Sequence, residues 1–200
     1  MHRGAAPSRL EDTSMTAHLR LLALLALGAC GALPPAQYAS LPPDAVAGAG
    51  DPLRSAVANT SVAFASPQKL AGRPAEAAQA VAQMEYLAVE IPNNVRYPSI
   101  SPTVGTQFAQ ARREWRSALG IAPDAPPQPV IESLYAASRA IRAGQPDAAA
   151  SALPAAVFPQ GGQTAVLRLA SMPGLPLTNQ AAVAATDALR RTDGAPRGRF

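Results

Sequence analysis

The chain has few of the side chains that most often carry enzyme chemistry. Its 200 residues include one cysteine, Cys30, and two histidines, His2 and His18. A lone cysteine excludes a disulfide within the chain and a zinc site built from several cysteines. Both histidines precede Cys30, and we expect the segment before Cys30 to be removed from the mature protein. Without them, Ser-His-Asp and Cys-His nucleophile systems and histidine-based acid–base catalysis are excluded.

Charged and aromatic residues are also scarce, at 15% and 4% of the chain. The 17 basic and 13 acidic residues give a net charge of +4, and Lys69 is the single lysine. A nucleic-acid surface needs clustered positive charge and stacking aromatics, and neither is present in the sequence. Gly161-Gly162 lacks the lysine and the preceding strand of a phosphate-binding loop. We therefore expect no nucleic-acid partner, no cofactor and no metal site.

Residues 15–30 (MTAHLRLLALLALGAC) contain the most informative pattern in the chain. Arg20 provides a short positive head, and an apolar run follows from Leu21 to Leu33. That run spans 13 residues, fewer than the roughly 20 that a membrane-spanning helix needs. Small residues before Cys30 complete the pattern of a secretory signal peptide.

The end of this segment, Leu27-Gly28-Ala29-Cys30, resembles the lipobox of bacterial lipoproteins. The resemblance implies cleavage between Ala29 and Cys30 and a diacylglycerol on the Cys30 sulfur, which anchors the protein in a membrane. In Gram-negative lipoproteins an aspartate after the cysteine favours the inner membrane, so Gly31 favours the outer membrane. A plain secretory signal is the alternative interpretation.

Composition divides the whole chain into successive segments. Residues 1–14 precede the signal and suggest that translation begins at Met15, and 15–29 is the signal peptide. Residues 30–50 are rich in Pro, Gly and Ala and predict a lipidated N-terminus followed by a flexible tether. An arm that packs through Tyr38 and Leu41 is the alternative. A helical domain is expected over 51–191 and a disordered tail over 192–200.

Helical periodicity and end signals predict an all-α fold, an irregular bundle of five to seven short Ala-rich helices. Asp51-Pro52 and Ser101-Pro102 are typical helix starts, and Gly120 is a typical C-cap. Thr178 is expected to cap the last helix. The expected helices are 52–65, 74–91, 102–119, 130–141, 147–153, 163–171 and 179–191.

The candidate site lies between the second and third of these helices. If they pack antiparallel, Glu85 meets Arg112 or Arg116, and Tyr86 lies nearby. Paired arginines are suited to clamping an anionic ligand. The alternative is a set of ion pairs on the helix flanks, each contributing about 0–1 kcal/mol at a surface.

Tyr97 is a further candidate contact. It lies in a loop with two asparagines and an arginine, Asn93-Asn94-Val95-Arg96. An exposed aromatic in such a loop would favour partner binding. The alternative is that Tyr97 closes the end of the bundle.

Beyond Cys30 the chain loosely resembles small helical lipoproteins of Gram-negative bacteria that have no assigned activity. We expect a non-enzymatic interaction or scaffolding protein, lipid-anchored and facing the periplasm, with an envelope protein as partner. The alternative is a binding module for a small or anionic ligand between the second and third helices. An enzyme that uses carboxylates alone has the least support, because no spacing indicates a catalytic pair.

Overall fold

Prolines mark where most helices of this chain begin. The computed structural model describes residues 1, 37–94, 96–97 and 100–194. Its elements are α2 (Pro43–Val46), α3 (Pro52–Ala63), η2 (Pro67–Lys69), α4 (Pro74–Asn93), α5 (Pro102–Leu119), α6 (Pro127–Arg142), α7 (Pro146–Ser151), α8 (Gly162–Ala170) and α9 (Pro176–Gly194). All of them except α8 begin at a proline. The backbone N–H that proline lacks costs no hydrogen bond at this position, because the first-turn N–H groups have no partner within the helix.

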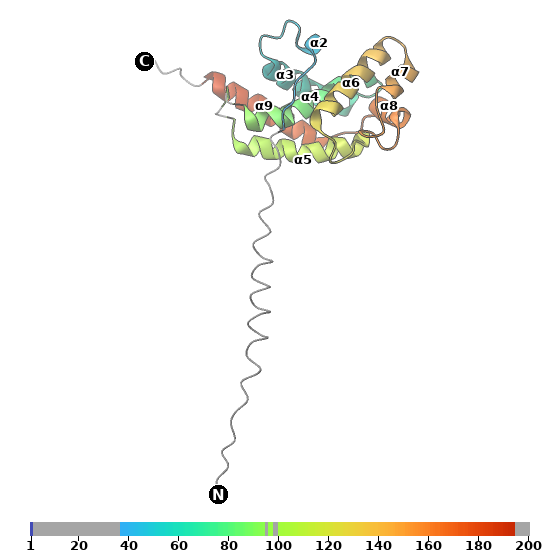
Figure 1. The fold of residues 1–200 in the computed structure, drawn as a ribbon. Helices are drawn as coiled ribbons and strands as arrows, with labels where there is room; N and C mark the ends of the chain where they lie inside the picture. The colour runs from blue at the N-terminus through green and yellow to red at the C-terminus, as the bar shows by residue number, and fades with distance from the viewer. Residues whose placement is uncertain (2–36, 95, 98–99, 195–200) are drawn as a thin grey trace. The chain divides into compact units, whose positions relative to one another are not determined.

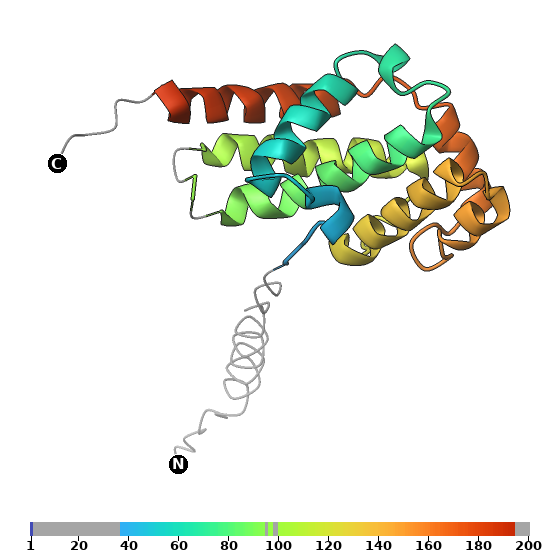
Figure 2. The same cartoon turned by 90° about the horizontal axis from the view of Figure 1, so that it is seen from above.

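The helices pack around α4. This helix contacts α3, α5, α6 and α8, and α5 runs beside α9 on the other side of the bundle (Figures 1 and 2). Helices α6, α7 and α8 gather at one end of the bundle (Figure 1). The described residues contain helices and loops but no strand, so the all-α expectation is confirmed.

Alanine lets the helices approach closely, while a few large side chains fill the centre. Helix α4 buries Ala77, Ala78 and Ala82, each fully inaccessible to solvent. Phe108 and Trp115 on α5 are also fully buried. Burying large aromatic side chains removes much apolar surface from water, which stabilises the bundle.

Three of the expected helix ends are confirmed. The Asp51 carboxylate accepts hydrogen bonds from the backbone N–H groups of Leu53 (2.9 Å) and Arg54 (3.2 Å). Ser101 accepts one from the N–H of Thr103 at 3.2 Å. Gly120 ends α5 in the left-handed region, with φ of 71°. These signals are local in sequence, which is why they could be predicted.

The seven expected helices correspond to α3–α9, and the single-turn helix α2 is additional. The expected ends of α9 were wrong. It begins at Pro176 and extends to Gly194, into the predicted tail. Thr178 is not its cap but a buried residue of its first turn, where its hydroxyl donates to Glu114 at 2.7 Å.

The described part of the predicted tether packs on the domain, which corrects our expectation of a free linker there. The Ser40 N–H donates to Gln128 at 2.8 Å, and Asp44 pairs with Arg139 at 3.0 Å. Leu41 packs against the core, as in the alternative arm interpretation, whereas Tyr38 is 80% exposed. No described helix is both long and apolar enough to cross a membrane. The predicted extension after Met1, the signal peptide, the lipobox with Cys30, and positions 195–200 lie outside the described residues.

Candidate functional site

Glu85 lies at the centre of the predicted site and is completely buried. Its Oε1 accepts hydrogen bonds from Arg116 Nε at 2.7 Å and from the indole N–H of Trp115 at 2.8 Å. Its Oε2 accepts from Arg116 Nη2 at 2.8 Å and from Arg112 Nε at 3.0 Å. A buried carboxylate is costly unless it is paired and hydrogen-bonded, and these four donors provide that compensation.

Arg116 has little capacity left for a ligand. Two of its nitrogens form a bidentate pair with Glu85, and its Nη1 donates to the carbonyl oxygens of Ala122 (3.2 Å) and Pro123 (2.9 Å). Its side chain is 5% exposed. Arg116 therefore connects α4, α5 and the loop after α5, and this is a structural role.

Arg112 shares the same carboxylate. Its Nη2 lies 2.9 Å from Glu85 Oε2, and its Nη1 donates to Gln37 at 3.3 Å. Burial lowers the pKa of Arg112, opposed by the charge of Glu85 and reinforced by that of Arg116. Two guanidinium groups thus share one buried carboxylate, which leaves an excess positive charge on the side of Arg112.

Glu85 contacts Arg112 and Arg116, as the sequence predicted. Their arrangement, however, matches neither the predicted ligand clamp nor the alternative of ion pairs on the helix flanks. Both guanidinium groups donate hydrogen bonds to the Glu85 carboxylate, so the two arginines form no ligand clamp between α4 and α5. They are not exposed flank pairs either, because the carboxylate is buried. Removing one partner of such a pair leaves an uncompensated buried charge, which makes it far more sensitive to mutation than a surface pair.

Tyr86 lies on a different side of α4 from its neighbour Glu85. With Asp51, Glu90 and Arg96 it lines a hollow of about 390 Å³. Burial, together with the charges of Glu90 and Asp51, raises the pKa of Tyr86 to about 12. Burial also raises the pKa of Glu90. The phenol is therefore neutral at physiological pH. It lies outside the cluster that Glu85 forms with Arg112, Trp115 and Arg116, which we call the Glu85 cluster.

Tyr97 closes the end of the bundle, as in the alternative interpretation, and is 8% exposed. Its hydroxyl donates to Asp51 at 2.5 Å and accepts from Arg54 Nε at 2.8 Å. The Arg54 guanidinium carbon lies 5.1 Å from the centre of the ring, and Arg54 also pairs with Asp193 at 2.6 Å. These contacts fix Tyr97 within the fold instead of presenting it to a partner.

Sequence reasoning missed a cavity of about 440 Å³ beside the Glu85 cluster. The lining includes Arg112, Arg113 and Ser117 on one side, and Ile121 and Asp124 on the other. The loop after α5 forms the second wall, and Arg116 holds that loop by its carbonyls. The arginine spacing on one helix was visible in the sequence, but the position of the loop was not.

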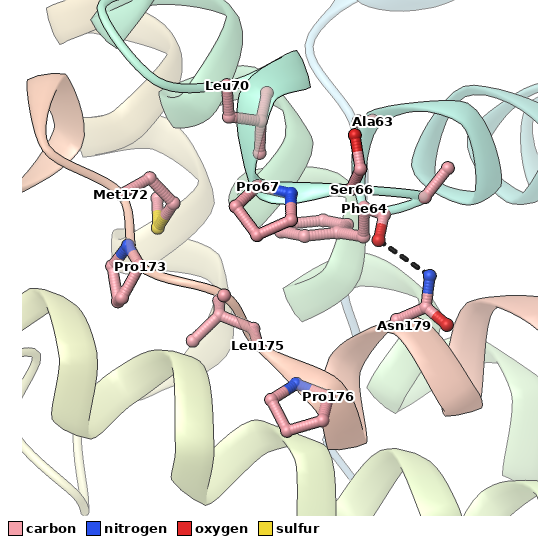
Figure 3. A pocket seen from close by; sticks show the side chains of 12 residues that line it. Ala63, Phe64, Ser66, Pro67, Leu70, Met172, Pro173, Leu175, Pro176 and Asn179 are labelled. Carbon is pink, nitrogen blue, oxygen red and sulfur yellow. Dashed lines mark hydrogen bonds between the residues drawn. The ribbon is translucent and has the colours of Figure 1, made fainter.

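A third hollow, of about 320 Å³, is mostly apolar (Figure 3). It lies between the segment joining α3 to α4 and the segment joining α8 to α9, and Phe64, Leu70 and Met172 line it. Asn179 donates to the carbonyl of Phe64 at 2.6 Å, which connects the two walls. Its residues come from two Pro-rich connectors distant in sequence, so no periodicity indicated it.

The ionisable side chains in the described part of the chain are carboxylates, arginines, tyrosines and Lys69. No group of three or more described His, Cys, Asp or Glu side chains is placed to hold a metal ion. No family model, no curated protein and no solved structure matches the chain.

Proposed function

We propose that this protein is a lipid-anchored interaction or scaffolding protein of a Gram-negative cell envelope, facing the periplasm and without enzymatic activity. The observation that carries the proposal is the Leu27-Gly28-Ala29-Cys30 motif behind a short apolar run. Two or three acyl chains hold a protein stably at a membrane, whereas one chain binds only marginally. Lipidation of Cys30 would therefore be sufficient to fix the helical domain at a bilayer.

The use of charged side chains in the domain supports a role in binding over catalysis. Glu85, Arg112 and Arg116 hydrogen-bond to one another and to the adjoining loop, and Tyr97 is engaged by Asp51 and Arg54. These groups connect helices to one another. A helical domain held close to a membrane is suited to presenting a surface to another envelope protein.

A crosslinked pull-down from membranes tests the proposal, with the Cys30→Ala variant as the matched comparison. An adaptor predicts one envelope protein, recovered near stoichiometrically with the wild type and lost with the variant. Equal amounts of both proteins must be present, because loss of the anchor can also reduce abundance. Equal recovery of the same partner with both would contradict a need for anchoring.

Enzymatic activity would contradict the proposal more directly. A turnover reaction that one polar substitution in the domain abolishes, without loss of folding, would show that the protein is an enzyme. Because substitutions at the buried Glu85 and Arg116 are expected to destabilise the fold, exposed positions such as Arg113 are the informative ones to substitute.

The alternative function, binding of a small or anionic ligand, is favoured by one observation. The cavity beside Arg112 and Arg113 has arginine on one wall and a volume within the usual range for small-molecule sites, roughly 300–1,000 Å³. This cavity differs from the ligand site that we expected between α4 and α5, because the Glu85 side chain fills the space there.

A further inference from the structure

The cavity between α5 and the loop at 121–125 has an excess of positive charge. Arg112, Arg113 and Arg116 line it, while the nearby carboxylates are Asp124 on the loop and Glu85 behind the wall. Three guanidinium groups and two carboxylates leave one positive charge uncompensated. Because the hydrogen-bond donors of Arg116 are engaged by Glu85 and two backbone carbonyls, the excess positive charge resides on Arg112 and Arg113.

Arg113 and Ser117 have donors to spare. Arg113 has no hydrogen-bond or ion-pair partner among the described residues, and the same holds for the Ser117 hydroxyl. They lie four positions apart on α5, so both face the same side of the helix. An anionic group placed there could accept from Arg113, Ser117 and the partly exposed edge of Arg112.

The opposite part of the cavity is apolar. Ile121 and Ala125, which line it, are 4% and 6% exposed, and Ala109 adds a third small apolar surface. Apolar walls with a few converging polar groups are typical of sites for small organic ligands. Free inorganic phosphate alone would leave this surface unused.

We propose that this cavity binds a small organic anion, with its carboxylate or phosphate group against Arg113, Arg112 and Ser117 and a short apolar portion against Ile121 and Ala125. The proposal does not depend on lipidation of Cys30. The same chemistry is present in a soluble organic acid or phosphate and in the headgroup of an anionic lipid.

The single tryptophan gives a direct readout. Trp115 donates to the carboxylate that Arg112 also contacts, so an anion that contacts Arg112 changes the electric field at the indole. The full chain in non-ionic detergent is titrated with hexyl phosphate while Trp115 fluorescence is recorded. Hexanol tests whether the charge is needed, and inorganic phosphate tests the apolar portion.

Arg113→Gln is the test variant, because Arg113 is exposed and supports no other residue. Arg190→Gln on α9 removes the same charge at a side chain that is 77% exposed and outside the cavity. Because charge-assisted hydrogen bonds are the strong ones, we expect Arg113→Gln to weaken hexyl phosphate binding roughly tenfold or more. Arg190→Gln should change it by less than roughly twofold, in line with weak surface electrostatics.

Saturable binding of hexyl phosphate that Arg113→Gln weakens and hexanol does not reproduce would support the site. Displacement by phosphatidylglycerol added to the detergent micelles, but not by phosphatidylcholine added in the same way, would identify a lipid headgroup as the source. Absence of such displacement would identify a soluble anion. Equal binding by wild type and Arg113→Gln, equal binding of hexanol, or no saturable signal would overturn the proposal, whatever the result at Cys30.

Discussion

Arg116 and Glu85 form a bidentate ion pair in the interior of the bundle, with N–O distances of 2.7 and 2.8 Å. Arg116 is 4% exposed and Glu85 is inaccessible. The remaining Arg116 nitrogen holds the loop carbonyls of Ala122 and Pro123. This one side chain thus fixes the relation between α4, α5 and the wall of the arginine-lined cavity.

Replacing Glu85 with alanine should destabilise the domain strongly. It leaves two guanidinium groups and an indole N–H without their acceptor, a loss of roughly 3–5 kcal/mol for a buried pair. Urea unfolding measures the change in the free energy of unfolding. Glu132→Ala, at an exposed carboxylate that accepts from Gln128, is the control and should change stability by less than about 0.5 kcal/mol. Similar values for both variants would contradict a buried, shared carboxylate.

Glu114 should stabilise the start of α9. Its carboxylate accepts from the N–H groups of Leu177 (3.1 Å) and Thr178 (2.8 Å), so it satisfies first-turn donors of a helix distant in sequence. Glu114→Ala should cost about 1–2 kcal/mol, as loss of a helix cap does. Hydrogen exchange should show faster exchange in α9 than in α4. Glu114→Gln keeps an acceptor and should have an intermediate effect; uniform acceleration in both helices would contradict local docking.

Gly162 should not tolerate a side chain. A Cβ there would collide with the backbone carbonyl of Ala150 in α7, and a backbone group cannot move aside without shifting its helix. Gly162→Ala should therefore lower stability by roughly 1–3 kcal/mol, as overpacking does. Gly50→Ala is the matched control, because a Cβ at Gly50 meets nothing within 4 Å. Equal thermal unfolding midpoints for the two variants would show that α7 and α8 lie further apart.

Asp51 should make stability depend on pH in acid. Burial raises the pKa of Asp51, but hydrogen bonds from Tyr97, Arg54 and Leu53 outweigh this effect and hold it below the ordinary value. A carboxylate whose pKa is lowered on folding stabilises above its unfolded pKa. That stability is lost as pH falls below about 4, through the folded pKa.

Asp51→Asn keeps a side-chain oxygen for the helix cap but removes the titration. Its free energy of unfolding should therefore fall less than that of the wild type between neutral pH and about pH 3. Tyr97→Phe removes one of the bonds that lower the pKa and should lie between the two. Parallel pH profiles for wild type and Asp51→Asn, measured by urea unfolding, would exclude this role for Asp51.

The parts of the fold that sequence predicts are those with local causes. Asp51-Pro52, Ser101-Pro102 and Gly120 act within one or two turns of their own helices, so the ends they mark could be placed from the sequence. The apolar stripe of α4 likewise follows from helical spacing. The start of α9 was misplaced because Thr178, a plausible cap, bonds instead to Glu114, 64 positions away.

The candidate site was only partly predictable for the same reason. The meeting of Glu85 with Arg112 and Arg116 followed from packing two neighbouring helices, but burial of the carboxylate depends on everything around it. The partners of Tyr97 are 43 and 46 positions distant, and Asp44 lies 95 positions from Arg139. Contacts at such separations are set by the tertiary fold, which periodicity does not describe.

The state of Cys30 tests the central claim most directly. The full gene is expressed in a Gram-negative host with an alkyne analogue of palmitate, and the protein is captured from washed membranes and analysed by mass spectrometry. Lipidation at Cys30 predicts a labelled N-terminal peptide that begins at Cys30 and carries at least two acyl chains, and no label on the Cys30→Ala variant. An unlabelled protein that retains residues 15–29, or one cleaved at another position without a lipid, would contradict it.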